Sequence, residues 1–297
     1  MTEADFLDRL RALPLHPGAQ RLADDAARLG SHVLTTDTLV EGVHFLSHDP
    51  PGDVAWKLLA VNLSDLAAKG ARPVGVLLNY PIRDDEWDRG FLAGLDGALR
   101  QLGCQLLGGD TVTLPPGAPR VLTLTAIGSA DDAIDRGGAQ PGDGLFVTGT
   151  IGDAGAGLAI ARGREGPADL LAAYRRPVPR LDLGEALAAK VHAMMDVSDG
   201  LLIDAQRMAA ASGLGVTIDL AAVPLSDSYR RHAGDDRAAR LAAATAGDDY
   251  QLLFAAPAAL AVPARRVGVF AAGAGLSLVD GGTAVALPAR LGYLHGD

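Results

Sequence analysis

Cysteine is nearly absent from this chain. Cys104 is the only one among the 297 residues. A disulfide within the chain is therefore impossible, and no CxxC pair exists that would hold a zinc ion. A fold held together by disulfides or by a CxxC zinc site is therefore excluded.

Long apolar runs and an excess of positive charge are also missing. No stretch reaches the roughly 18 apolar residues of a membrane span, and the acidic segment MTEADFLDRL is unlike a signal peptide. We therefore expect a soluble, cytoplasmic protein. The formal net charge of −10 argues against nucleic acid or a membrane as a partner. A bound phosphate would need a mediating cation, and a divalent metal ion is the natural candidate.

Aromatic residues are scarce, but aliphatic ones are not. Aromatics make up 4% of the chain and hydrophobic residues 48%, so the cores must be aliphatic and alanine-rich. The length suits two domains. The glycine- and proline-rich segment RGGAQPGDG marks a boundary, and strands and helices mix on both sides of it. We therefore expect a two-domain α/β (α+β) fold, with domains at residues 1–135 and 136–297.

The apolar patterns predict the elements of both halves. In the first half, we expect strands at 32–36, 73–80, 104–108 and 120–128, and helices at 53–69 and 85–102. In the second half, we expect strands at 145–149, 215–220, 250–256 and 285–290, and helices at 152–163 and 181–192. The segment MMDVSDGLLID, at 194–204, should run from a strand into a helix.

One local pattern recurs, in which an aspartate follows an apolar run and small or hydroxylated residues. The strings are LTTDTLV, VNLSDLAA, LLGGDTV and MMDVSDGLL, with RLADDAA as a looser relative; the acids are Asp37, Asp65, Asp110, Asp199, Asp24 and Asp25. Taken singly, such an aspartate is usually a helix cap or a turn former. Five sites with no basic residue beside them favour another interpretation, because converging carboxylates need a cation. Mg²⁺ binds through a few carboxylates and substrate phosphates, so the pattern predicts an acidic metal–phosphate site.

The common nucleotide-binding motifs are absent. The chain contains no GxxxxGK[ST] string and no HRD and DFG set. The segment GTIGDAGAG, at 149–157, is glycine-rich between a strand and a helix, but close helix packing explains such glycines as well as phosphate binding does. A bound nucleotide would therefore require a fold unlike either standard kinase class.

At this point the chain resembles the thiamine-monophosphate kinases, in the superfamily that includes aminoimidazole ribonucleotide synthetase and selenophosphate synthetase. The motifs that carry the resemblance run in order along nearly the whole chain. They are DDAA (24–27), TTDTLVEGVHF (35–45), WKLLAVNLSDLAAKGARP (56–73), LLGGDT (106–111), RGGAQPGD (136–143), VTGTIGDAGAGL (147–158), MDVSDGLLID (195–204), GDDYQLLF (247–254) and GY (292–293).

The resemblance implies a PurM-like fold and a phosphoryl-transfer reaction. The N-terminal domain would bind ATP and Mg²⁺ and form a β-barrel across a homodimer, and the C-terminal domain would complete the active site. The reaction would be the ATP-dependent phosphorylation of thiamine monophosphate to thiamine diphosphate. The acceptor is a phosphate oxygen that is already ionised, so direct in-line transfer without a phosphoenzyme is expected. Several Mg²⁺ ions would remove the repulsion between the two polyanions.

The resemblance also implies roles for individual residues. The implied metal contacts are Asp25, Thr35, Thr36, Asp37, Asp65, Asp110, Asp196 and Asp199. The implied nucleotide contacts are Gly109, Asp110, Arg136 and Ser198, and the implied substrate contacts are His44, Asp248 and Tyr293. Catalysis would rest on Asp65, Asp110 and Arg136, whose guanidinium suits phosphate.

Local sequence leaves plainer interpretations open. Arg136 could be a solvated loop residue, His44 a structural histidine, and Ser198 the start of a helix at 199. The adjacent acids at 24 and 25 cannot be separated. Asp204 would project about 140° away from Asp199 around a helix, so we interpret it as a surface or structural acid.

Three departures from the family pattern concern the substrate pocket. Ala23 replaces a glycine before the first acid pair, and AGDDYQ stands where GGEDYE is usual, so Asp248 is one methylene shorter. Gly296 replaces a terminal aromatic residue, whose stacking contact is then lost or supplied by Tyr293. We expect an active kinase with an altered substrate pocket.

Two other functions remain as alternatives. One is another ATP-using branch of the superfamily, but those branches rely on a reactive cysteine or selenocysteine near the N-terminus or a cysteine at the C-terminus. This chain has neither, since it ends LGYLHGD. The other is a non-catalytic nucleotide or thiamine-phosphate binding protein.

Overall fold

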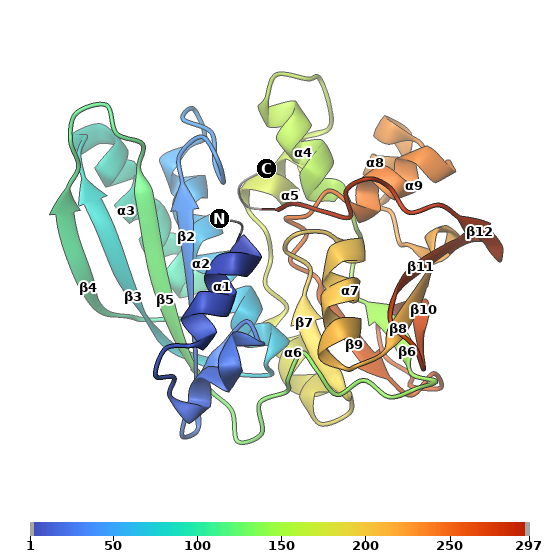
Figure 1. Ribbon diagram of the computed structural model, residues 1–297. Helices are drawn as coiled ribbons and strands as arrows, with labels where there is room; N and C mark the ends of the chain where they lie inside the picture. Colours follow the sequence, from blue (N-terminus) through green and yellow to red (C-terminus); the bar gives the residue numbers. More distant parts are fainter. Residues whose placement is uncertain (1–2, 295–297) are drawn as a thin grey trace.

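Two β-sheets lie side by side in the computed structural model, which describes residues 3–294 (Figure 1). A short helix and a 3₁₀ segment, α1 (Glu3–Arg11) and η1 (Pro17–Leu22), precede the first sheet. That sheet has the strand order β1 (Ala27–Leu29), β2 (His32–Val40), β5 (Val121–Ser129), β3 (Arg72–Ile82), β4 (Leu106–Thr113). Its pairs are antiparallel except β3–β4, which is parallel.

Helices cover one face of this N-terminal sheet. They are α2 (Pro51–Ala68) and α3 (Asp85–Gln101), which lie behind the strands in Figure 1. Strand β5 shows why the sheet has two unlike faces, because its residues alternate between buried and less buried. Leu122 and Leu124 pack under the helices, whereas Leu77, Leu107 and Val112 of the neighbouring strands remain exposed.

The second sheet is mixed and larger. Its order is β12 (Thr283–Val285), β11 (Gly275–Asp280), β8 (Gly215–Asp219), β10 (Arg265–Ala271), β6 (Gly144–Val147), β9 (Leu252–Ala256), β7 (Ala193–Asp196). Only β8–β11 is parallel. The helices of this half are α4 (Asp153–Ala161), α5 (Ala168–Arg175), α6 (Leu181–Ala188), α7 (Leu201–Ala211), α8 (Asp227–Ala233) and α9 (Arg237–Ala244), and η2 (Leu220–Ala222) follows β8. Helix α7 packs on β7, β8 and β11.

Helix α2 joins the two halves. It begins with Pro51 at its first position and ends before Gly70, whose φ of +64° suits glycine. Nearly every residue in it is buried, because it packs on β2 and β5 on one side and on β7 and α6 on the other. Gly184 of α6 permits this approach, since a Cβ there would lie 2.0 Å from the carbonyl oxygen of Ala67. The last turns of α2 therefore carry Asp65 to the junction of the sheets.

The structure agrees with most expected elements and corrects one. The expected strand at 285–290 is wrong, because β12 ends at Val285 and Pro288 lies beyond it. The proposed domain boundary lies in the segment that joins Ser129 to Gly144. In the described part of the chain, no helix is long and apolar enough to cross a membrane.

Candidate functional site

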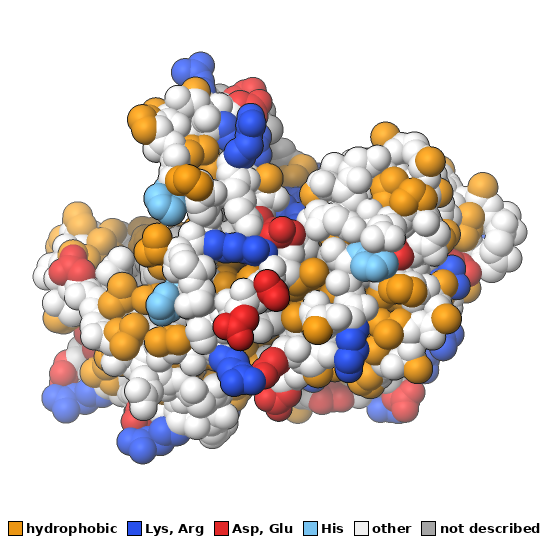
Figure 2. Space-filling model, turned by 90° about the horizontal axis from the view of Figure 1, so that it is seen from below, with side chains coloured by type: hydrophobic (Ala, Val, Ile, Leu, Met, Phe, Trp, Pro, Cys, Tyr) orange, Lys and Arg blue, Asp and Glu red, His pale blue; other side chains and the backbone are white. Residues whose placement is uncertain are grey.

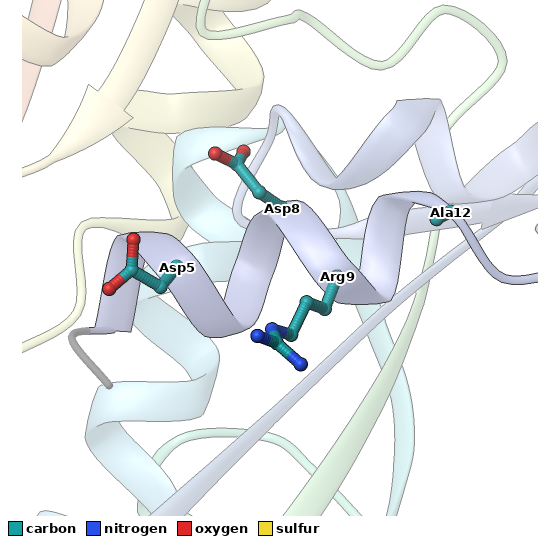
Figure 3. A pocket seen from close by; sticks show the side chains of 4 residues that line it. All are labelled: Asp5, Asp8, Arg9 and Ala12. Carbon is teal, nitrogen blue, oxygen red and sulfur yellow. The ribbon is translucent and has the colours of Figure 1, made fainter.

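A pocket of about 790 Å³ opens between the two halves of the chain. Its lining comes from β2 and the loop after it, from α2 and α4, from the turn between β7 and α7, and from residues near 248 and 293. It contains most of the residues that the sequence singled out: Asp25, Thr35, Thr36, Asp37, His44, Asp65, Asp196, Ser198, Asp199, Asp248 and Tyr293. A second hollow, beside α1, is lined by Asp5, Asp8 and Arg9 of that helix and by Ala12 just after it, and gathers none of them (Figure 3).

Three carboxylates, of which Asp196 is buried and Asp37 and Asp65 are half-buried, line this pocket together. Burial raises the pKa of Asp37 to about 6 and that of Asp196 to about 7, from an ordinary value of 3.8. Burial also raises the pKa of Asp65 well above that value, and the neighbouring charges of Asp37 and Asp196 raise it further. The negative charges of these three carboxylates repel one another, and a bound cation would reduce that repulsion.

Each of these acids is held by a neighbouring polar group. The hydroxyl of Thr35 donates to Asp65, and the hydroxyl of Ser64 donates to Asp196. The backbone N–H of Asp37 donates to the side-chain oxygen of Asn62 at 3.1 Å. Because Asn62, Ser64 and Asp65 all belong to α2, this helix orients the whole cluster.

The first acid pair separates into a structural and a pocket-facing residue. Asp24 has a side chain that is 6% exposed and contacts Lys69, and it accepts the backbone N–H of Arg136 at 2.8 Å. Asp25 lines the pocket and pairs with the guanidinium of Arg136. Sequence could not distinguish the two acids, whereas their positions do: Asp25 is the candidate ligand. Arg136 is not a solvated loop residue, because its side chain is 19% exposed.

The turn between β7 and α7 is organised by Asp204. This residue is fully buried, and one of its oxygens accepts the backbone N–H groups of residues 198, 199 and 200, each at 3.1 Å. Arg207 contacts both Asp204, at 2.9 Å, and Asp199. Asp204 is therefore structural, and the surface alternative is wrong. The expected angle between the Asp199 and Asp204 side chains assumed that both residues lie on one helix, but α7 begins only at Leu201.

Another part of the pocket lining is built around Asp248. Its carboxylate accepts from Lys57 at 2.7 Å and from the hydroxyl of Tyr250 at 3.1 Å. His44 lies nearby on the loop after β2, with Nδ1 accepting from the backbone N–H of Val40 at 3.0 Å. Tyr293, whose N–H donates to the carbonyl of Asp199 at 2.9 Å, also lines the pocket. Gly296, the position of the expected aromatic, lies outside the described residues.

Three predicted residues do not line this pocket within one chain: Arg136, which reaches it only through its ion pair with Asp25, and Gly109 and Asp110. Gly109 and Asp110 lie on β4, the exposed edge strand of the N-terminal sheet. Gly109 has a φ of +151°, and a Cβ there would lie 1.8 Å from the carbonyl oxygen of Leu78. Its glycine identity is therefore explained by the close approach of β3.

Basic side chains partner several of the acids. No basic residue stands beside these acids in the sequence. In the folded chain, however, Lys69, Arg136 and Arg207 each contact one or more of them. Figure 2 shows a face where acidic side chains gather in the middle with lysine and arginine beside them. Among the described residues, no three His, Cys, Asp or Glu side chains already stand together as a ready metal cage. Carboxylate and hydroxyl oxygens are ligands that Mg²⁺ prefers. To bind the ion, Asp25 and Asp199 would have to break their ion pairs with Arg136 and Arg207.

Comparison with known proteins places the fold in one class. The description "AIR synthase related protein, N-terminal domain" matches residues 23–130, and the corresponding C-terminal description matches residues 140–281. These matches and the two mixed sheets define a two-domain PurM-like protein. The expected fold class is confirmed at this level.

Closer relatives identify the branch. A thiamine-monophosphate kinase of Caulobacter vibrioides is 42% identical, over 99% of this chain and 91% of its own. One of Escherichia coli K12 is 40% identical, over 86% and 81%. A solved structure described as AaThiL complexed with AMPPCP and TMP has a TM-score of 0.86 at 29% identity, covering 99% of this chain and 97% of its own. The chain belongs to the thiamine-monophosphate kinase family.

Proposed function

We propose that this chain transfers the γ-phosphoryl group of ATP to thiamine monophosphate and so forms thiamine diphosphate and ADP. The observation that carries the proposal is the cluster of Asp37, Asp65 and Asp196 in a pocket between the two halves of a family member. A pocket lining that is acidic and strained by repulsion suits a reaction between two phosphates bridged by cations.

The reaction is a direct displacement at phosphorus. An oxygen of the acceptor phosphate forms a bond to the γ-phosphorus of ATP, while the bond from that phosphorus to its β–γ bridging oxygen breaks and ADP leaves. The acceptor oxygen is ionised at neutral pH, so no strong general base is needed. The enzyme's work is to align the two phosphates and to offset their charge.

The cofactor would be Mg²⁺. Asp25, Asp37, Asp65, Asp196 and Asp199, helped by Thr35 and Thr36, would hold several ions, whose charge offsets the repulsion between the phosphates. Arg136 and Arg207 already neutralise two of these acids. If those acids held metal instead, the two arginines would be free to donate to phosphate oxygens, and the planar guanidinium of Arg136 suits that role.

The nucleotide and the acceptor would bind at different ends of the pocket. Ser198 lies on the turn before α7 and lines the pocket, and its hydroxyl would contact the nucleotide; the N–H groups of that turn already donate to Asp204. His44, Asp248 and Tyr293 also line the pocket and would contact the organic part of thiamine monophosphate; the part that they line is called the acceptor end. The short side chain of Asp248 leaves room there, so tolerance of bulkier analogues is expected.

A homodimer would complete the site. The open face of the N-terminal sheet carries exposed Leu77, Leu107 and Val112, and β4 is exposed along its whole length. An apolar sheet face and a bare edge strand are surfaces that a second copy can cover. We infer that two N-terminal sheets close into a barrel, and that Gly109 and Asp110 then serve the pocket of the other copy.

The deciding assay uses purified protein with ATP, thiamine monophosphate and Mg²⁺, and separates the products by chromatography. Formation of thiamine diphosphate, stoichiometric with ADP and abolished by a chelator, is the expected result. Tight binding of both ligands without product would instead support the non-catalytic alternative. A phosphorylated enzyme trapped during a single turnover would exclude direct transfer.

A further inference from the structure

Lys57 is a buried cation that the proposed chemistry does not use. It belongs to α2, its side chain is 3% exposed, and it is absent from the pocket lining. A lysine is almost never buried to this degree unless it is paired. Its ammonium donates to Asp248 at 2.7 Å and to the carbonyl oxygen of His44 at 3.2 Å. The two residues that it holds both line the acceptor end of the pocket.

The surroundings of Lys57 fix its position. Its ammonium lies 4.2 Å from the centre of the Tyr174 ring, a favourable place for a cation. The hydroxyl of Tyr174 donates to Asp49 at 3.0 Å, and Asp49 accepts the N–H of Leu46 at 2.8 Å. Lys57 and Asp49 therefore hold the loop after β2 at two points, one on each side of Phe45.

Asp248 is constrained in its backbone as well as in its side chain. Its φ is +62° and that of Tyr250 is +49°, a region that residues other than glycine rarely adopt. The N–H groups of these two residues donate to the carbonyls of Ser198 and Val197, at 2.7 and 2.8 Å. With Lys57 on one oxygen and the Tyr250 hydroxyl on the other, the carboxylate has a single orientation, and its remaining lone pairs are available to a ligand.

We propose that Lys57 is a positioning residue for the acceptor substrate, which fixes the Asp248 carboxylate and the His44 loop so that the organic, cationic part of thiamine monophosphate binds in one orientation. This inference rests on the proposed function. Lys57 does not line the pocket, and the two residues that it holds, His44 and Asp248, are proposed acceptor contacts, so its effect belongs to the acceptor. A buried ion pair with only a structural role would affect folding and both substrates alike.

The test is steady-state kinetics of Lys57→Met, with each substrate varied in turn. We expect the KM for thiamine monophosphate to rise by about tenfold or more, with the KM for ATP changed by less than about twofold. Arg120→Met is the matched control, because Arg120 is also a buried cation, 8% exposed and paired with Glu41 at 3.5 Å, but lies outside the pocket. It should lower the melting temperature without raising the KM for thiamine monophosphate. Equal changes in both KM values for Lys57→Met, or no change, would overturn the proposal.

If Lys57→Met does not fold, the proposal is tested by comparing two variants that both lack the charge of Asp248. Asparagine tolerates the left-handed backbone at position 248 and can still accept from lysine, so Asp248→Asn keeps the contact without the charge. The double variant Lys57→Met/Asp248→Asn should have a KM for thiamine monophosphate about tenfold above that of Asp248→Asn. Equal values would overturn the proposal. Calorimetric titration of thiamine monophosphate tests the same difference without turnover, so an inactive wild-type protein would reject the proposed function and still leave this comparison decisive.

Discussion

Asp37 and Asp110 point to opposite faces of the N-terminal sheet, on strands three places apart. Asp37 shares one row across the sheet with Leu124, Leu78 and Gly109, and the two leucines of that row face the helices. Asp110 follows Gly109 and therefore faces the other side. At about 4.8 Å between strands, the two backbones are also roughly 14 Å apart. If both acids serve one reaction, they come from different copies.

Complementation between two inactive variants tests this arrangement. Asp65→Asn and Asp110→Asn should each be nearly inactive alone. When they are unfolded together and refolded, half of the dimers are mixed, and each mixed dimer has one pocket with both native acids. Recovery of roughly a quarter of wild-type activity is expected for such a two-fold assembly.

Asp196→Asn provides the matched control for that experiment. Asp65 and Asp196 line the same pocket of one chain, so mixing their variants should restore nothing. Activity in this control, or none in the mixture with Asp110→Asn, would contradict a shared site.

Removing one charge from the acidic cluster should separate activity from stability. In Asp65→Asn, the amide oxygen can still accept from Thr35, but the repulsion with Asp37 and Asp196 disappears. We expect turnover to fall at least about a hundredfold, near 2.7 kcal/mol of barrier, while the metal-free melting temperature rises by about 2 °C or more. Asp96→Asn, at a solvent-exposed acid of α3, should change neither quantity. A less stable metal-free Asp65→Asn would refute the repulsion argument.

The same acids predict how stability depends on pH. The folded-state pKa values of about 6 for Asp37 and about 7 for Asp196 lie above the ordinary 3.8, so the folded protein binds more protons than the unfolded chain between these values. Their contribution is fully present below pH 4 and is lost as the pH rises through 6 and 7. Mg²⁺ competes with these protons. Its stabilisation of the wild-type protein, measured by melting with and without the ion, should therefore be larger at pH 8 than at pH 5; the reverse order would exclude these acids as ligands.

Local sequence was sufficient for elements whose signals are local. The strand and the helix expected within 194–204 are β7 and α7, because a short apolar run ends at a glycine-containing turn. No strand was expected at β10 or β11, since RRVGVFA begins with two charges and contains a glycine. Pairing with distant strands makes these segments strands: β10 pairs with β6 and β8, and β11 with β8 and β12. Edge strand β12 was misplaced by several residues for the same reason.

The same distinction between local signals and long-range contacts holds for the residues of the candidate site. The acids of the pocket could be found because their motifs are contiguous, but their partners could not. Lys57 and Asp248 are 191 residues apart, and Arg136 and Asp25 are 111 apart. Asp204 was interpreted as a surface or structural acid on a helix that was extended backwards through a turn; the structure corrects the start of the helix and excludes the surface alternative. Long-range pairing and burial decide such roles, and neither has a local signature.

Asp204 gives the sharpest test of that correction. Asp204→Ala removes the acceptor of three backbone N–H groups and one partner of Arg207, all at a fully buried site. We expect a loss of about 3 kcal/mol in the free energy of unfolding, together with a higher KM for ATP, because the turn that carries Ser198 and Asp199 loosens. Denaturant unfolding and kinetics measure the two effects. Asp227→Ala, at an acid of α8 with a side chain 81% exposed, should remain within about 0.5 kcal/mol of wild type, and a similarly small change for Asp204→Ala would restore the surface interpretation.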